Sequence, residues 1–285
     1  MKRVVFTAVV LLVFITGLTI LLYPYVTGYI NSLSQTRVVQ QYHRDVETLS
    51  EDEFIELFEA ARAYNEALAK KGSSFTLSEA EIQEYLGMLD PFGNGVIGTL
   101  TIDKINVNLP IYHGTNEGVL QMGAGHLEGS SLPIGGAGTH TVITGHRGLP
   151  TSLLLTELDK LVIGDTFTLN VLNETMVYEV DRIIVVEPHE LEELAIVSDK
   201  DYCTLVTCTP YGINSHRMLI RGERKDTGQE QGQEEVTGDR LQVFTEAGTI
   251  DSRLVAGILL IPPFVIVAVY LGISIRKLRG RGRTK

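Results

Sequence analysis

The sequence predicts a mainly β protein with helices on its N-terminal side and a membrane-spanning helix near each end. Three observations lead to this prediction. Seven short runs rich in β-branched and aromatic residues begin at Gly95 and are separated by Gly, Pro, Asn and Asp. Helix-capping sequences and apolar residues at helical spacing precede them, and two long uncharged apolar runs stand near the chain ends. Because no long helix separates the seven runs, they favour a barrel or a sandwich.

The composition excludes several classes of protein. A chain of 285 residues has room for one or two domains. With 44% hydrophobic and 21% charged residues, it is neither wholly disordered nor collagen-like. Two cysteines are too few for a scaffold held together by disulfides. The net charge of −11 argues against nucleic-acid binding along the whole chain.

The two apolar runs predict membrane anchors. Residues 4–22 follow Lys2 and Arg3, and residues 254–275 precede the six basic residues of the C-terminal tail. At ~1.5 Å per residue, each run matches a hydrocarbon core about 30 Å thick. Positive residues flank the outer side of both runs, so the positive-inside rule places both termini in the cytoplasm and residues 25–253 outside. We therefore expect a two-pass protein of the cell membrane with an extracellular central part.

Each anchor has an alternative interpretation. The first run could be a cleaved signal peptide, although its 19 residues exceed an ordinary signal-peptide core. The second could be a buried core helix, although its length and basic flank favour a span. The basic tail fits contact with anionic lipid more simply than contact with nucleic acid. The ends hold 8 of the 24 Lys and Arg residues and no acids, which leaves 16 basic against 35 acidic residues between them, a net charge of −19.

Between the anchors the pattern is first helical and then β. From Asn31 to about Lys71 apolar residues recur at helical spacing, and a capping box starts at Ser50. A second cap at Ser78 predicts a short helix that ends near Gly87, before a cluster of turn-forming residues. The predicted strands are GVIGTLTI, NVNLPIY, THTVITG, TFTLNVL, TMVYEVDRIIVVE, YCTLVTC and HRMLIRG.

The two cysteines both lie in the predicted strand YCTLVTC. Five residues along a strand span about 16 Å and put Cys203 and Cys208 on opposite faces, so no disulfide is expected between them. One should point into the core and the other outward. Cys208 stands at the strand end, where a site can open. An isolated pair of cysteines is nevertheless more often structural than catalytic.

A catalytic thiolate needs a base or a positive charge nearby, and acyl transfer needs donors for the developing oxyanion. Of the seven histidines, His146 in TGHRG has the most suggestive setting, at a predicted strand end. Arg217 lies nine residues beyond Cys208 on the next predicted strand, so a short connection would bring it beside the thiolate. Arg147 and Arg221 remain alternatives.

At this point three segments resemble a known family. TLVTC at 204–208 resembles the TLxTC signature of sortases, the cysteine transpeptidases of Gram-positive surfaces. The continuation TPYGINSHRMLIRG is similar to the segment that carries their active-site arginine, and TGHRG resembles their histidine segment. The separations of 62 and nine residues between the three candidate residues also fit the family. The resemblance covers roughly residues 25–275.

The resemblance implies a sortase-type closed β-barrel of about eight strands, and it implies roles for four residues. Cys208 is the nucleophile, His146 transfers protons, Arg217 positions substrate and stabilises the oxyanion, and Thr207 helps to position substrate. The enzyme would cleave an LPxTG-type sorting signal at the threonine carbonyl and pass the thioacyl group to an amine. No nucleotide is needed, because the peptide bond that is broken supplies the energy of the bond that is made, and no other cofactor is expected. No metal is expected either, because no spacing of possible ligands demands one.

Two further features resemble class C, the pilin-polymerising sortases. One is the pair of membrane anchors with a basic tail, and the other is the turn Asp90-Pro91-Phe92, which resembles the class C lid. The resemblance implies that Asp90 pairs with Arg217 and that Phe92 covers Cys208. An ordinary loop turn is the alternative. The implied partners are pilin subunits with sorting signals and acceptor lysines, together with membrane lipid and without nucleic acid.

Two other functions stay open: a sortase that attaches proteins to the cell-wall precursor, and a non-catalytic membrane scaffold with a sortase-like barrel. The predicted organisation has six parts, which are an N-terminal transmembrane segment at 1–25, helices and lid at 26–95, the catalytic barrel at 96–222, a polar acidic tether at 223–252, a transmembrane helix at 253–275 and a basic cytoplasmic tail at 276–285.

Overall fold

The computed structural model describes residues 2–72, 75–149 and 152–225. Most of the predicted acidic tether, the second transmembrane helix at 253–275 and the basic tail at 276–285 lie outside the described residues. The second anchor and the two-pass topology are therefore predictions from the sequence.

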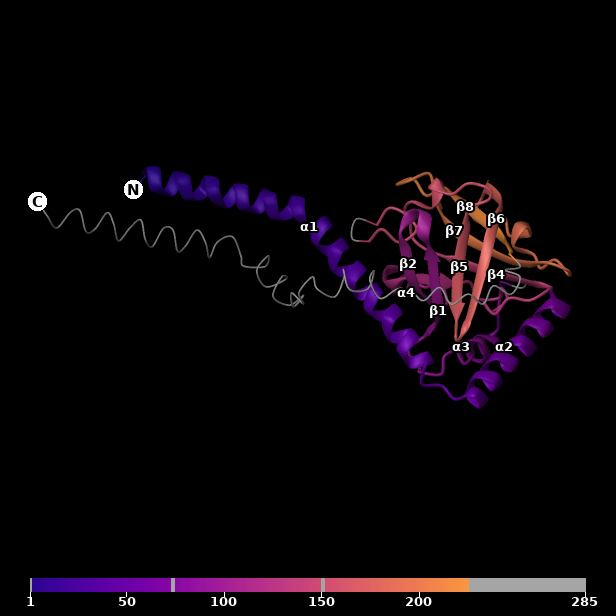
Figure 1. Ribbon diagram of the computed structural model, residues 1–285. Coiled ribbons are helices and arrows are strands. Elements are labelled where there is room, and N and C mark those ends of the chain that lie inside the picture. The colour runs from indigo at the N-terminus through magenta and orange to yellow at the C-terminus, as the bar shows by residue number, and fades with distance from the viewer. Residues whose placement is uncertain (1, 73–74, 150–151, 226–285) are drawn as a thin grey trace, which may run out of the picture. The chain divides into compact units, whose positions relative to one another are not determined.

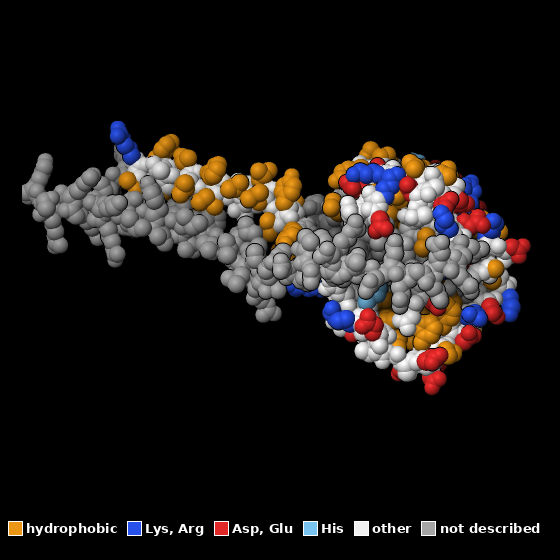
Figure 2. All heavy atoms as spheres, viewed as in Figure 1, with side chains coloured by type: hydrophobic (Ala, Val, Ile, Leu, Met, Phe, Trp, Pro, Cys, Tyr) orange, Lys and Arg blue, Asp and Glu red, His pale blue; other side chains and the backbone are white. Residues whose placement is uncertain are grey.

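The first helix, α1, extends from Lys2 to Val46. Its N-terminal part is long and apolar enough to cross a membrane, and its apolar side chains are exposed in Figure 2. The helix does not break at the expected boundary near residue 25. Pro24 lies inside it, where the missing N–H removes one helical hydrogen bond, and the helix continues to Val46.

Two further helices begin at the predicted capping boxes. Helix α2 covers Glu51–Lys71 and helix α3 covers Glu79–Leu86. In each, the N-cap serine side chain accepts a hydrogen bond from the N3 backbone, and the N3 glutamate accepts one from the N-cap backbone. The helix α3 ends before Gly87, as its sequence predicts. Both helix starts are thus local features that the sequence alone encodes.

Eight strands close into a barrel in the order β1-β2-β3-β4-β7-β8-β6-β5 (Figure 1). The β2/β3 and β4/β7 pairs are parallel and the other pairs are antiparallel. The prediction of a barrel of about eight strands is confirmed. The strands are β1 Val96–Ile102, β2 Val107–His113, β3 Ala124–His126, β4 Thr139–Thr144, β5 Thr166–Val171, β6 Glu174–Val186, β7 Asp201–Thr209 and β8 His216–Arg224.

The seven predicted β-rich runs all contain strands, and the sequence missed only β3. That strand has three residues, Ala-Gly-His, and none of them is β-branched. It forms because it pairs with β2 on one side and β4 on the other. A short helix, α4, covers Glu117–Met122 between β2 and β3.

One hydrophobic core joins the barrel interior to the helices that cover it. Leu100, Ile143, Leu205 and Ile220 are fully buried inside the barrel, and Tyr42 of α1 belongs to the same cluster. Residues from α2, α3 and the turn after α3 complete this core: Ala61, Tyr85 and Leu89. The helical part after residue 31 therefore packs as part of the barrel domain.

Tyr42 ties α1 to two barrel segments and gives the first testable prediction. Its hydroxyl donates to the Ile97 carbonyl at 3.3 Å and accepts from the Leu172 N–H at 2.7 Å, and burial raises the pKa of Tyr42 to about 12. Tyr42→Phe strands both buried backbone groups, so the free energy of unfolding should fall by about 1–3 kcal/mol. Urea unfolding of the full chain in detergent measures this. Tyr211→Phe, at an exposed tyrosine, should unfold like the unaltered protein, and equal stability of both variants would contradict the assignment.

Candidate active site

Strand pairing brings the segments that carry the three predicted catalytic residues together at one end of the sheet. Strands β4 and β7 run parallel with Thr144 opposite Val206, and the Gly145 N–H continues the ladder to the Val206 carbonyl at 3.1 Å. β4 ends at Thr144, and His146 stands in the segment that follows it, two residues beyond Thr144, as Cys208 is two residues beyond Val206. On the other side of β7, Cys208 stands directly opposite Arg217 of β8. Cys208 and Arg217 therefore lie on neighbouring strands about 4.8 Å apart, and His146 lies in the segment after β4, the strand on the other side of β7.

The two cysteines differ as the strand pattern predicts. Both are free thiols; Cys203 is fully buried and Cys208 is partly exposed. Burial raises the pKa of the Cys203 thiol well above its usual value, so this thiol stays protonated and unreactive. The expectations that no disulfide joins the pair and that only one cysteine faces outward are confirmed.

His146 follows β4 in a segment that other residues hold tightly. Its carbonyl accepts from the Leu155 N–H at 3.2 Å, and a Cβ at the preceding Gly145 would come within 2.8 Å of the Leu155 side chain. The ring Nε2 lies 3.3 Å from a carboxylate oxygen of Glu117, at the start of α4. The side chain is 24% exposed, which leaves it open toward a bound substrate.

Two other histidines are structural. His126 is fully buried, its Nε2 lies 2.8 Å from the Ser131 carbonyl, and burial lowers its pKa to about 4. The His140 ring lies between the Ala195 carbonyl and the Thr204 hydroxyl, at 2.9 and 2.7 Å, and burial lowers its pKa as well. Neither ring is placed to exchange a proton with Cys208.

The contacts of the three candidate arginines separate them. Arg147 binds Asp159 and lies 3.5 Å from the Thr209 hydroxyl. Arg221 binds Asp181 through two nitrogens and stacks over the Tyr202 ring at 4.1 Å. Both therefore serve the structure.

Arg217 differs from these two arginines. Its Nη1 donates only to the backbone carbonyls of Asn214 and His216, at 3.2 and 3.1 Å. Among the residues that the structure describes, its guanidinium makes no ion pair. Its remaining N–H groups are thus available for an oxygen of a substrate.

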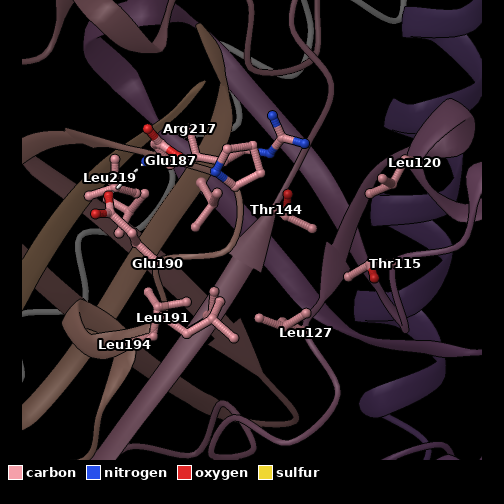
Figure 3. Close-up of a pocket in the computed structure, with 14 residues that line it drawn as sticks. Thr115, Leu120, Leu127, Thr144, Glu187, Glu190, Leu191, Leu194, Arg217 and Leu219 are labelled. Carbon is pink, nitrogen blue, oxygen red and sulfur yellow. Dashed lines mark hydrogen bonds between the residues drawn. The ribbon is translucent and has the colours of Figure 1, made fainter. Parts of the chain in front are cut away.

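An apolar groove of about 270 Å³ runs along the outer face of the same three strands and reaches Arg217 (Figure 3). Its floor consists of Val142 and Thr144 of β4, Val206 of β7, and Arg217 and Leu219 of β8. One wall is the β6–β7 loop with Leu191 and Leu194, and the other carries Thr115, Leu120 and Leu127.

The floor residues lead to the thiol. Side chains alternate along a strand, so Val206 and Cys208 lie on the same face. Cys208 therefore continues the row that forms the groove floor. The arrangement can hold an extended apolar chain along the strands with one of its carbonyl carbons beside the thiol.

The structure places two further residues that the sequence singled out. Thr207 is buried on the other face of β7, and its hydroxyl donates to the Gly145 carbonyl at 2.8 Å. It therefore holds the segment that carries His146 and does not line the groove. The expected pair between Asp90 and Arg217 does not form, because the Asp90 carboxylate accepts the N–H groups of Asn94 and Gly95 at 3.0 and 2.9 Å.

The predicted lid turn is well ordered by these two bonds. Phe92 is half-buried and packs against the main hydrophobic core. A local reason explains the error for Asp90: an aspartate that opens a turn readily binds backbone N–H groups a few residues later. An ordinary loop turn is the alternative that the sequence around Asp90 also allows.

No sequence pattern points to Glu117 or to the walls of the groove. The floor could have been found, because Val206 is two residues before Cys208 in a predicted strand. The walls come from the region around α4 and from the β6–β7 loop, which are separate from β7 in the chain, and no local pattern marks them. Within residues 2–72, 75–149 and 152–225, no three His, Cys, Asp or Glu side chains are grouped to hold a metal ion.

Comparisons with known proteins agree with this geometry. Residues 100–225 match the model of the sortase domain. Sortase C1 from Streptococcus agalactiae is 47% identical, with a TM-score of 0.65 over 66% of this chain and 98% of that structure. A lid mutant of sortase A from Corynebacterium diphtheriae is 42% identical, with a TM-score of 0.60 over 64% of this chain and 98% of that structure.

A curated relative that bears a different sortase name matches a shorter stretch of this chain. Sortase D from Bacillus subtilis is 29% identical over 130 residues, which are 45% of this chain and 63% of that relative. The chain thus spans less than two thirds of the length of this relative, whereas it covers nearly all of the two solved structures. The fold, the order of the three segments and these similarities lead to one conclusion: the chain belongs to the sortase family.

Proposed function

We propose that this protein is a class C sortase, a cysteine transpeptidase that joins pilin subunits through their sorting signals. The observation that carries the proposal is the pairing of Cys208 with Arg217 between β7 and β8, with His146 in the segment that follows β4 and with an apolar groove that Arg217 lines. A thiol beside an imidazole and an unpaired guanidinium has what acyl transfer needs.

The proposed reaction has two steps. The Cys208 thiolate attacks the threonine carbonyl of an LPxTG-type signal, and the Arg217 guanidinium donates hydrogen bonds to the oxyanion that forms. His146 gives its proton to the departing amine as the carbon–nitrogen bond breaks, which leaves a thioester. A lysine amine of a second subunit then attacks the thioester, His146 takes up a proton, and the thiolate leaves as the isopeptide bond forms.

The groove supports a sorting signal as the substrate. Its floor and walls are mostly aliphatic, and such a surface binds the leucine and proline that begin the signal. The β6–β7 loop wall is fixed in place, because His140 connects the Ala195 carbonyl of that loop to Thr204 of β7. A preformed groove of this kind orders the peptide before the chemical step, which lowers the entropic cost of reaction.

The class assignment rests on the solved structures and on the sequence. A similar structure bears the name sortase C1, another is named a lid mutant, and the sequence predicts two anchors with a basic tail. The curated relatives are called sortase A and sortase D. Attachment of proteins to the cell-wall precursor is therefore the second candidate function. In both cases we propose a two-pass membrane protein with an extracellular barrel.

One experiment separates these functions. The full chain in detergent is incubated with an LPxTG-type peptide and either a peptide with the pilin lysine or a cell-wall cross-bridge amine. Mass spectrometry should find a thioester on Cys208 and a product with the lysine peptide. A product only with the cross-bridge amine would favour the second function. The absence of any thioester would exclude both and favour the non-catalytic scaffold.

We further propose that the turn at residues 90–95 restricts access to the site as a lid. Asp90→Ala removes the carboxylate that holds the Asn94 and Gly95 N–H groups, so the turn should loosen. The rate of Cys208 alkylation by iodoacetamide should then rise severalfold. Asp103→Ala changes an exposed aspartate that directly follows β1 and lies outside this turn. It should leave the alkylation rate unchanged. Equal rates in all three proteins would show that the turn is no lid.

A further inference from the structure

A carboxylate faces the catalytic histidine from an element that the sequence analysis did not connect with the site. The Oε2 atom of Glu117 lies 3.3 Å from the Nε2 atom of His146. Glu117 is the first residue of α4, and this helix is separated from His146 by β3 and β4. The contact therefore results from the fold.

Local hydrogen bonds hold this carboxylate in place. The side chain of Asn116 caps α4 by accepting from the Val119 N–H at 3.1 Å. The Gln121 side chain donates to Oε1 of Glu117 at 2.9 Å, which leaves Oε2 for His146. The pKa of Glu117 is lowered, first by the Gln121 hydrogen bond and then by the charge of His146. Glu117 is therefore ionised in the range where a histidine titrates.

The His146 Nε2 atom has no other partner. It is shielded from solvent and makes no hydrogen bond that meets ordinary geometry within the described residues. The Glu117 side chain is 68% exposed, so the contact closes one side of the imidazole and leaves the carboxylate in water. With Nε2 turned to Glu117, Nδ1 is the ring nitrogen left to exchange protons at Cys208.

We propose that Glu117 is a positioning residue that orients the His146 ring and stabilises its protonated form. This inference rests on the proposed function. In the reaction His146 must hold a proton while Cys208 is a thiolate, and an adjacent carboxylate favours the charged imidazole. In the first step the proton moves from the imidazolium to the departing amine, and in the second step it returns from the attacking amine. Glu117 itself neither gains nor loses a proton.

The other charged groups around His146 come from three elements. Cys208 of β7 and Arg217 of β8 stand opposite each other on neighbouring strands. When Cys208 is a thiolate, the two side chains carry opposite charges. Arg147 in its own segment is bound to Asp159. Among the described ion pairs, Glu117 supplies the carboxylate that contacts His146.

Helix α3 offers a matched control. Glu79 is also the first residue of a capped helix, and it accepts a hydrogen bond from the Gln83 side chain four residues later. This geometry repeats that of Glu117 and Gln121, but no histidine is paired with Glu79 in the described ion pairs. Glu79→Gln therefore removes the same kind of carboxylate without touching an imidazole.

The test compares Glu117→Gln and Glu79→Gln with the unaltered full chain in detergent. The first readout is the pH dependence of kcat/KM for cleavage of an LPxTG-type peptide, and the second is the pH dependence of Cys208 alkylation by iodoacetamide. In Glu117→Gln the limb that reports the imidazole should move to lower pH by up to about 0.7 unit, as expected for an exposed ion pair. The shift should shrink in 1 M salt, where charges are screened within about 3 Å.

The outcomes are distinguishable. The pH profiles of Glu79→Gln should match those of the unaltered protein. The profiles of Glu117→Asp should lie between those of Glu117→Gln and those of the unaltered protein. A Glu117→Gln profile that superimposes on the unaltered one, or that is lowered equally at every pH, overturns the inference. If the unaltered protein cleaves no peptide, the proposed function is wrong instead. The alkylation profile still tests the contact between Glu117 and His146 in that case.

Discussion

Cys208→Ala is expected to abolish both thioester formation and the covalent pilin ladders. The reason is chemical: an alanine methyl group cannot attack a carbonyl, and the other thiol, Cys203, is buried on the opposite face of β7. The measurement is a denaturing gel of pilin from cells that carry the variant, with mass spectrometry of the purified protein after incubation with a sorting-signal peptide. Cys208 is partly exposed, so the fold should be unaffected.

Cys203→Ala is the matched control for this variant. It removes a fully buried sulfur from the barrel core and should lower the free energy of unfolding by about 1 kcal/mol. The ladders should persist, because this thiol takes no part in the reaction. Ladders that persist in Cys208→Ala at normal protein levels would show that another residue carries the acyl group. Loss of ladders in both variants at equal stability would contradict the assignment of Cys208 as the nucleophile and of Cys203 as a core residue without a part in the reaction.

Arg217→Ala is expected to lower kcat for the sorting-signal peptide by about 10²–10³-fold, the usual loss when an oxyanion donor is removed. In the structure Arg217 stands opposite Cys208, and its Nη1 is held by the carbonyls of Asn214 and His216. Arg217→Lys should recover only part of the activity, because an ammonium lacks the planar fork of donors. Stopped-time product analysis by chromatography gives kcat and KM for each protein.

Arg221→Ala is the control on the same strand. It removes the ion pair with Asp181 and the contact over Tyr202, so it should lower stability and leave kcat within a few-fold of the unaltered value. If Arg221→Ala lost as much kcat as Arg217→Ala, the assignment of the oxyanion donor by strand register would be wrong. Circular dichroism of each variant would separate a folding defect from a catalytic one.

Much of the fold could be predicted from local patterns. The capping boxes at Ser50 and Ser78 begin helices because each pairs a serine with a glutamate three residues later. The β-rich runs form strands because their apolar residues face a common core. The strand Ala124–His126 was missed, since its pairing with β2 and β4 is a property of the closed barrel. The helix α1 continues past residue 25, and the division there between a transmembrane segment and a helical region stays a prediction.

The candidate site could be predicted only in part. His146, Cys208 and Arg217 were identified because each stands in a segment similar to a sortase motif. The pairing of Cys208 with Arg217 follows from the β7/β8 register, the β4/β7 pairing brings the segment after β4 to the same end of the sheet, and a motif carries no information about register. The pair expected between Asp90 and Arg217 is absent, because the Asp90 carboxylate binds nearby backbone N–H groups. The Thr207 hydroxyl binds the Gly145 carbonyl, and its substrate-positioning role stays a prediction.

The sequence by itself determined which thiol stays in the core, where α2 and α3 begin, and that the first apolar run can serve as an anchor, and it predicts which residues carry the chemistry. These properties depend on residue type and on spacing over a few positions. Only the tertiary structure decided that Arg217 and not Arg221 faces Cys208, that loops form the groove walls, and that Glu117 lies beside His146. Those contacts join residues far apart in the chain, and the closure of the barrel sets their distances.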